Sequence, residues 1–352
     1  MKIVFLIDRM NGFGGAQRVA SVLCNQFAKK NNVLILLTGE EKKSVYNLNS
    51  QINIYCCGRI SKLKKIILIR KKIKEFKADI VISFLTMVNI YTILSLLRTK
   101  IPLIISERND PDRCTKNEKI LSKILYNFST AAVVQTNEIK RKLKKFYKKE
   151  IYVIQNPIIE TNYEKINYEK YNKIVAVGRL NEQKNYPLMI EAFSYFIEKY
   201  PQYELLIYGI GDKEKYLKDI CKKNKLENKV LFKGNVSNVL EREIETDFFI
   251  MTSNFEGMPN ALAEAMAIGM PCIATNCDGR GAAELINNGV NGILIEKGNL
   301  TELIKAMYLL TENIEYRKQI AKEAKKIKIK LSCEEIGNKW LEYIEFILKK
   351  GK

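Results

Sequence analysis

Short apolar runs alternate with amphipathic stretches along the whole chain of 352 residues. The runs are nearly continuous in apolar residues, a pattern typical of strands that a parallel sheet buries on both faces. In the first half they are Ile3–Ile7, Val33–Thr38, Ile52–Cys56, Ile80–Phe84, Leu103–Ser106, Ala131–Gln135 and Ile151–Ile154. In the second half they are Ile174–Leu180, Leu205–Tyr208, Val230–Lys233, Phe248–Thr252, Cys272–Thr275 and Gly292–Ile295.

Helical spacing fills the intervals between these runs, so the fold class is α/β with two doubly wound, Rossmann-like domains. Residues 1–160 form one predicted domain and residues 173–352 the other. Between them, residues 161–172 are polar and rich in tyrosine, without apolar periodicity, and indicate a linker. The last predicted helix, Glu334–Lys350, carries one apolar stripe, and we expect it to pack back on the N-terminal domain.

The longest apolar stretch, Ile80–Leu97, approaches the length of a membrane span. Its first part is β-branched and its second part has helical spacing with Asn89 inside, which favours a strand followed by a buried helix over a transmembrane helix. The N-terminal apolar run is too short for a signal peptide, because Asp8 and Arg9 follow it directly. Eight cysteines without a C-x-x-C pair indicate a reducing compartment.

Positive charge is concentrated in the first half of the chain. Residues 1–165 contain 31 Lys and Arg against 13 Asp and Glu, a net charge of +18, whereas residues 166–352 contain 28 against 26. Such asymmetry predicts a surface that meets an anionic partner. Arg59–Lys77 mixes cations with apolar residues at near-helical spacing, as in helices that lie on anionic bilayers, and Lys140–Lys149 adds a second basic patch. Solvated helix faces are the alternative; a nucleic-acid partner is disfavoured because no binding motif appears.

The segment Thr252–Ile286 carries the clearest chemical pattern. A strand ends, a loop with Glu256 follows, and Pro259 is expected at the first position of a helix that contains Glu264. The backbone amides of such a helix start, here residues 257–261, suit a phosphate group. Acidic residues near a helix start also stabilise its dipole, which is the alternative role for each glutamate alone.

This segment resembles the nucleotide-sugar-binding region of the family-4 glycosyltransferases, which have the GT-B fold. Three further stretches agree with the family and occur in its order: GFGGAQRV at Gly12–Val19, VGRLNEQKN at Val177–Asn185 and YGIGD at Tyr208–Asp212. Together they span nearly the whole chain. The resemblance implies two domains that face each other across a cleft, with the nucleotide sugar held by the C-terminal one.

The resemblance also implies roles for individual residues of the C-terminal domain. Arg179 and Lys184 match the pair of cations that grips the donor diphosphate, and such a pair suits an anion that gains charge as the bond breaks. Glu256 matches the residue that contacts the transferred sugar, and Glu264 the residue that binds ribose. Donor-binding backbone is expected at Gly257, Met258, Pro259 and Asn260.

In the N-terminal domain, Gly14 and Gly15 are expected in the turn after the first strand, where paired glycines let the backbone approach a ligand. Glu107 follows a predicted strand and is a candidate contact for sugar or acceptor; an ion pair with Arg108 or another basic residue is the alternative. Many relatives use a histidine near the donor sugar, but this chain has none. A histidine base and histidine metal ligands are therefore excluded.

These observations predict a retaining hexosyltransferase with a nucleotide-sugar donor, UDP being favoured over GDP on family frequency. No cofactor and no metal are predicted, since the cations and the helix start would stabilise the leaving group. The expected acceptor is a membrane glycan or polyprenyl-diphosphate-linked sugar, which places the enzyme on the cytoplasmic face of an anionic membrane. An inverting GT-B enzyme and a non-catalytic nucleotide-sugar or nucleic-acid binding module remain alternatives.

Overall fold

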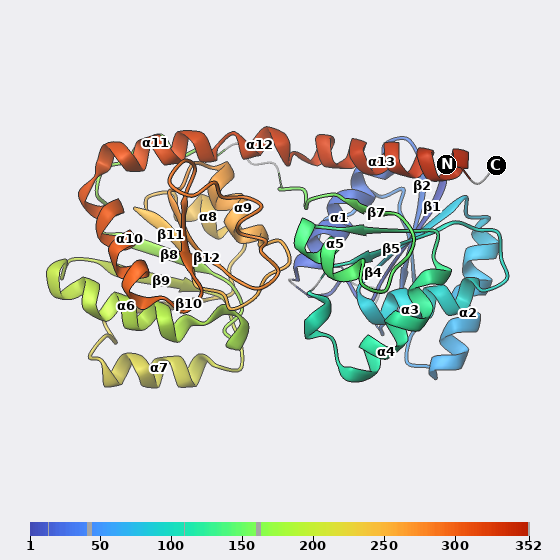
Figure 1. The fold of residues 1–352 in the computed structure, drawn as a ribbon, viewed down its shortest axis with the longest axis horizontal. Helices are drawn as coiled ribbons and strands as arrows, with labels where there is room; N and C mark the ends of the chain where they lie inside the picture. The colour runs from blue at the N-terminus through green and yellow to red at the C-terminus, as the bar shows by residue number, and fades with distance from the viewer. Residues whose placement is uncertain (13, 41–43, 109, 160–162, 351–352) are drawn as a thin grey trace. The chain divides into compact units, whose positions relative to one another are not determined.

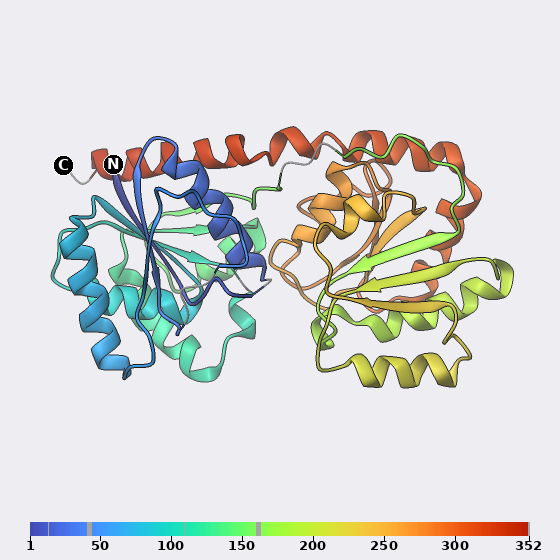
Figure 2. The ribbon, with the colours of Figure 1, turned by 180° about the vertical axis from the view of Figure 1, so that it is seen from behind.

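The computed structural model describes residues 1–12, 14–40, 44–108, 110–159 and 163–350. It divides into two compact units, the first made of Met1–Ile159 with Leu331–Lys352 and the second of Glu160–Lys330 (Figures 1 and 2). Each unit contains one sheet whose paired strands are all parallel. The α/β class predicted from the alternating runs is therefore confirmed.

The sheet of the first unit has the strand order β3-β2-β1-β4-β5-β6-β7. Its strands are β1 (Lys2–Ile7), β2 (Asn32–Leu37), β3 (Asn53–Cys56), β4 (Ile80–Phe84), β5 (Leu103–Glu107), β6 (Ala131–Val134) and β7 (Ile151–Val153). The helices are α1 (Gly15–Ala28), α2 (Lys62–Phe76), α3 (Thr86–Leu96), α4 (Lys116–Leu125), α5 (Asn137–Leu143) and α13 (Cys333–Lys350), with the 3₁₀ turns η1 (Pro111–Arg113) and η2 (Tyr126–Phe128).

Alternate residues of β1 bury against opposite layers, as expected of a sheet covered on both faces. Val4 belongs to a core cluster that includes side chains of α2, α3 and α5. On the other face, Phe5 packs edge-on against Phe84, and Phe84 lies 6.1 Å from Trp340 of α13, measured between ring centroids. The α13 helix runs beside α1, and it completes the cover of this face (Figure 1).

The apolar stretch Ile80–Leu97 forms β4 and most of α3, so the prediction of a strand followed by a buried helix is confirmed. Asn89 in α3 is fully buried, and its side-chain amide donates to the carbonyl of Ser106 at 3.2 Å. Within the described part of the chain, every helix is too short or too polar to cross a bilayer.

The second unit has the strand order β10-β9-β8-β11-β12-β13. Its strands are β8 (Lys173–Val177), β9 (Glu204–Tyr208), β10 (Val230–Gly234), β11 (Phe248–Met251), β12 (Cys272–Asn276) and β13 (Ile293–Glu296). The helices are α6 (Tyr186–Lys199), α7 (Glu214–Lys223), α8 (Val239–Arg242), α9 (Asn260–Ala267), α10 (Leu300–Glu312), α11 (Ile314–Ala324) and α12 (Ile327–Lys330), with the 3₁₀ turn η3 (Glu182–Lys184).

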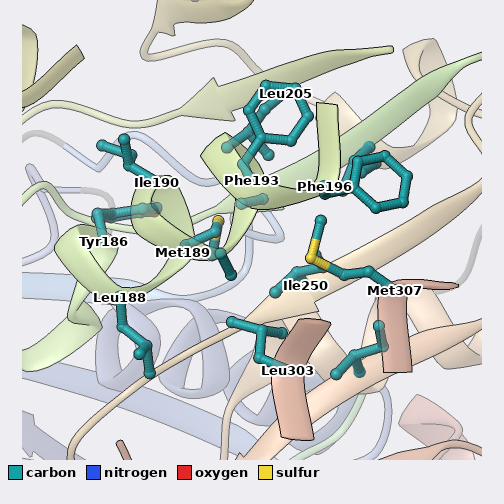
Figure 3. Packing of buried hydrophobic residues seen from close by; sticks show 14 of the residues in the cluster. Tyr186, Leu188, Met189, Ile190, Phe193, Phe196, Leu205, Ile250, Leu303 and Met307 are labelled. Carbon is teal, nitrogen blue, oxygen red and sulfur yellow. The ribbon is translucent and has the colours of Figure 1, made fainter. Parts of the chain in front are cut away.

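One core of this unit joins α6 and α10 to one face of the sheet (Figure 3). Phe193 and Phe196 of α6 are fully buried there, together with Leu303 of α10 and Leu205 of β9. The residues before the sheet are anchored too: Lys165 is 2% exposed and donates to the carbonyl of Ile244 at 2.8 Å. This packing holds the loops at the carboxyl ends of the strands on a rigid base.

Candidate active site of the second unit

The strand order of the second unit reverses between β8 and β11, because β9 and β10 extend the sheet on one side and β12 and β13 on the other. Ligands of such sheets bind where the order reverses, outside the carboxyl ends of the strands. The loops that leave β8 and β11 at this point contain Arg179 and Lys184 in one case and Glu256 in the other. Residues 72 positions apart in the chain therefore meet here.

Hydrogen bonds fasten these two loops to each other. The Thr252 hydroxyl donates to the carbonyl of Lys184 at 3.1 Å, and the backbone amide of Asn254 donates to the carbonyl of Gln183 at 2.8 Å. In return, the side-chain amide of Gln183 donates to the carbonyl of Phe255 at 3.0 Å. The positions of Lys184 and Glu256 are thus set by backbone contacts of their neighbours.

Lys184 and Glu256 form an ion pair in which Nζ lies 2.6 Å from Oε1. Their side chains are only 16% and 9% exposed, so water screens this pair less than it screens a surface pair. The hydroxyl of fully buried Ser253 donates to the same Oε1 at 2.9 Å. Burial, together with the charge of Glu256, raises the pKa of the Cys277 thiol to about 12. The pair is therefore a largely desolvated centre in which Ser253 and Lys184 share one carboxylate oxygen of Glu256.

Glycines let the loops of this site approach closely. A Cβ on Gly209 would lie 1.9 Å from the carbonyl oxygen of Gly178, and the φ of Gly209 is +141°, a region that L side chains rarely adopt. A Cβ on Gly178 would lie 2.8 Å from Cε of Lys184, so the lysine stem crosses directly over this glycine. Arg179 follows Gly178 and is exposed. Both predicted cations therefore lie in the segment that follows the carboxyl end of β8.

The helix α9 begins beside the ion pair, one residue later than predicted. Pro259 is the N-cap residue and not the first helical residue; its φ is −78° and its ψ is 103°, and its carbonyl accepts from the amide of Ala263 at 3.1 Å. Proline has no side-chain acceptor, so it leaves the amides of the first turn to other partners. Asn260 opens the helix, and Glu264 lies one turn later, half-buried.

The loop before α9 packs against the loop that follows β12. The amide of Glu256 donates to the carbonyl of Asp278 at 2.8 Å, and a Cβ on Gly281 would lie 1.9 Å from the carbonyl oxygen of Gly257. Met258, next to Gly257, is buried. Glycine at position 281 is therefore explained by close backbone approach, which fixes the residues that precede the helix.

In the first unit, Gly14 and Gly15 lie at the start of α1. Gly14 is the N-cap residue with extended backbone, and its carbonyl accepts from the Tyr46 hydroxyl at 3.2 Å. Gly15 is the first residue of the helix, whereas the sequence places it in the preceding turn. This unit also reverses its strand order, between β1 and β4, and α1 starts at the end of β1.

Glu107 is the last residue of β5 and lies in the interior of the first unit, 2% exposed. Its carboxylate accepts from the Thr86 hydroxyl at 3.0 Å and from the Tyr126 hydroxyl at 2.7 Å. Burial and the carboxylate charge raise the pKa of Tyr126 above its usual value. Glu107 is therefore held by buried hydroxyl groups, and its role as a contact for sugar or acceptor stays a prediction.

Sequence reasoning missed Thr252, Ser253 and Asn254, which hold the loop after β11 in place. The signal that could have found them is a run of three polar residues directly after a buried apolar strand, at the switch point of the sheet. In the part of the chain that the structure describes, no group of three or more His, Cys, Asp or Glu residues is placed to hold a metal ion.

Comparisons with known proteins match both halves of the chain. Residues 13–161 match the family model described as Glycosyltransferase Family 4, and residues 159–327 match the model described as Glycosyl transferases group 1. Among curated proteins, the chain is 28% identical over 361 residues to the GalNAc-α-(1→4)-GalNAc-α-(1→3)-diNAcBac-PP-undecaprenol α-1,4-N-acetyl-D-galactosaminyltransferase of Campylobacter jejuni, with 98% of each chain covered.

A second curated relative matches a shorter part of the chain. It is the UDP-Gal:α-D-GlcNAc-diphosphoundecaprenol α-1,3-galactosyltransferase of Escherichia coli, 34% identical over 159 residues, which are 43% of this chain and 40% of that one. Among solved structures, Anabaena HepE in complex with UDP-glucose has a TM-score of 0.83 and 18% identity, covering 98% of this chain and 99% of that chain. This likeness supports the GT-B fold.

Proposed function

This chain belongs to the group 1 and family 4 glycosyltransferases, and we propose that it transfers a hexose or N-acetylhexosamine from a UDP-sugar to a lipid-linked glycan. The product would contribute to a bacterial surface polysaccharide or related glycan. The names of the C. jejuni and E. coli relatives support this proposal, because both state undecaprenol-diphosphate-linked acceptors. The E. coli name also states a UDP-sugar donor.

The observation that carries the proposal is the Lys184–Glu256 pair at the switch point of the second sheet. Lys184, Arg179 and the amides at the start of α9 would bind the donor diphosphate. A diphosphate that offers Lys184 two anionic oxygens would compete with the single carboxylate and draw the ammonium away from Glu256. The carboxylate of Glu256, still held by Ser253, would then accept hydrogen bonds from hydroxyls of the transferred sugar. Glu264 would bind the ribose.

The departing UDP gains negative charge as the glycosidic bond to phosphate breaks. Two cations and a helix start would stabilise that charge more in the transition state than in the bound donor, which would accelerate the reaction. We infer that no metal is required for this step. The chain has no histidine, so the leaving phosphate oxygen would accept the proton of the acceptor hydroxyl. In the first unit, the backbone around Gly14 and Gly15 would approach the substrates.

We further propose retention of configuration. The α-linkages in the names of both relatives support this, because the sugar of UDP-galactose is itself α-linked to phosphate. The enzyme would act on the cytoplasmic face of the membrane that holds its acceptor. Proton NMR of the new anomeric centre tests the stereochemistry, since a β-linked product from an α-linked donor would indicate inversion.

The test of the proposed function is release of UDP. UDP-glucose, UDP-galactose, UDP-GlcNAc, UDP-GalNAc and their GDP counterparts are first screened for an increase in melting temperature, since a bound ligand stabilises the folded state. The donor found is then assayed with undecaprenyl-diphosphate-linked saccharides. We expect a UDP-sugar to bind and UDP to be released when acceptor is added. Binding without UDP release for every acceptor would favour a non-catalytic binding module.

A further inference from the structure

Two helices of the first unit carry large apolar side chains on their outer surfaces. They are Leu63 and Ile67 of α2, Ile120, Leu121 and Ile124 of α4, and Phe128 of η2, all between 38% and 68% exposed. We refer to these six residues as the α2–α4 surface. Single exposed apolar residues are ordinary, but a group of six on adjacent elements indicates an interaction site.

The α4 helix has its apolar residues on the outside. Ser122 is the residue that it buries, while Ile120, Leu121 and Ile124 face outward. The helix start is nonetheless well determined: Thr115 and Glu118 form a capping box in which each side chain accepts from the backbone of the other. A stable helix that exposes its apolar side is therefore built into this unit.

The α2 helix combines apolar and cationic residues on its outer side. Ile69 and Ile73 anchor it in the core, and Leu63 and Ile67 point away from it. The helix carries seven Lys and Arg residues and one acidic residue, Glu75. Cations around exposed apolar side chains are the arrangement of helices that lie in the interface of an anionic bilayer.

The two helices present one surface and not two. Both pack against α3, which lies between them in the ribbon (Figures 1 and 2). Lys62 at the start of α2, Met87 of α3, and Ile120 and Leu121 of α4 line one shallow hollow. Apolar side chains from α2 and α4 can therefore enter the same partner at the same time.

We propose that the α2–α4 surface docks on an anionic phospholipid bilayer, with its apolar side chains in the acyl boundary and its lysines among the headgroups. The positive charge decides between possible partners, because a second copy of this surface would bring like charges together, whereas an anionic bilayer neutralises them. The other basic patch is less suited to this role. Lys142 is paired with Asp110 at 2.7 Å, and Lys149 donates to the carbonyl of Ser129. This inference goes beyond the proposed reaction, since it assigns a membrane contact to named residues outside the site.

The proposal is tested by sedimentation with vesicles of phosphatidylcholine and phosphatidylglycerol at 3:1, against vesicles of phosphatidylcholine alone, in 100 mM salt. We expect binding to the anionic vesicles, weakened at least about 100-fold by the triple change Ile120→Ser, Leu121→Ser and Ile124→Ser. Neutralising Lys64→Gln and Lys74→Gln should weaken it about tenfold. The matched control changes three exposed apolar residues of the second unit, Ile166→Ser, Leu309→Ser and Ile329→Ser, and should bind as the wild type does.

Several outcomes separate this proposal from the proposed reaction. Unchanged vesicle binding by the α4 triple variant, or no binding by the wild type, would overturn the docking surface while UDP-sugar binding stayed intact. Conversion of a dimer to a monomer by the same variant, seen by light scattering, would instead assign the surface to self-association. If the α4 variant fails to fold by circular dichroism, Leu63→Ser with Ile67→Ser serves in its place, with an expected loss of about tenfold.

Discussion

Replacing Lys184 by alanine removes the ammonium that lies 2.6 Å from Glu256 at the switch point of the second sheet. Two quantities should respond by different amounts. The first is the free energy of unfolding, because Glu256 keeps its hydrogen bond from Ser253 but loses its cationic partner. For a pair whose side chains are 16% and 9% exposed, we expect a cost of about 1–3 kcal/mol.

The second quantity is turnover. If Lys184 binds the departing diphosphate, its removal takes away one fixed charge that stabilises the transition state, and losses of that kind are about 10²–10³-fold in kcat. Such a loss corresponds to about 3–4 kcal/mol of activation free energy. The effect on catalysis should therefore exceed the effect on stability, which is the signature of a residue that acts in the reaction.

A matched control separates the two effects. Lys199 also lies 2.6 Å from a carboxylate, that of Glu312, but this pair is exposed and lies away from the switch point. Lys199→Ala should cost about 1 kcal/mol or less and leave turnover unchanged. UDP release at saturating donor measures kcat, and urea unfolding followed by circular dichroism measures stability. Turnover of the Lys184→Ala enzyme within about threefold of wild type would refute the mechanism.

Three further predictions concern stability, each measured by urea unfolding. Gly209→Ala should destabilise the protein by more than about 3 kcal/mol, because its Cβ would lie 1.9 Å from a backbone oxygen. The control, Gly298→Ala, has a positive φ but open space around it, and should cost about 1–2 kcal/mol. Equal losses of stability in the two variants would contradict the close-approach argument. Burial lowers the pKa of Lys165 from 10.5 to about 8, so the unfolded chain binds more protons than the folded one between these values, and stability from this group rises with pH there. The free energy of unfolding of the wild type, minus that of the Lys165→Met variant, should therefore increase by on the order of 2 kcal/mol between pH 7.5 and 9.5. A difference that does not change with pH would show that the ammonium is well solvated. Trp340→Ala should cost about 3–5 kcal/mol of the free energy of unfolding, since the side chain is fully buried. Phe346→Ala, on the exposed side of the same helix, should cost about 1 kcal/mol or less. A cost for Trp340→Ala as small as that for Phe346→Ala would mean that α13 contributes little to the first unit.

The strands were predictable because a parallel sheet covered by helices requires continuous apolar runs, and few other structures do. Ile80–Phe84, for example, has the same bounds in the sequence prediction and in the structure. Helix starts were less accurate. Pro259 is compatible with both the first helical position and the N-cap. In the structure it is the N-cap, and the loop before it packs against Gly281, a contact that local sequence does not reveal.

The sequence suggests residues for the site, but it does not reveal the contacts between them. Lys184 was expected at the donor diphosphate and Glu256 at the transferred sugar, yet their ion pair depends on two loops that are distant in the chain. The role of Ser253 was not predicted because a serine after a strand is common. Its function follows only from the position of the Glu256 carboxylate, to which its hydroxyl donates. The partners of Glu107 were not predictable for the same reason: Thr86 and Tyr126 lie on other elements.

Because of α13, the first unit contains residues that precede the second unit in the chain and residues that follow it. During synthesis, residues 160–330 are complete and able to fold while the face of the first sheet that carries Phe84 still lacks Trp340. The usual N-terminal-first order of domain folding is therefore reversed for the final step. A chain that ends after residue 330 would have a finished second unit and a hydrophobic surface of the first unit exposed beside α1, which makes it a substrate for chaperones and proteases.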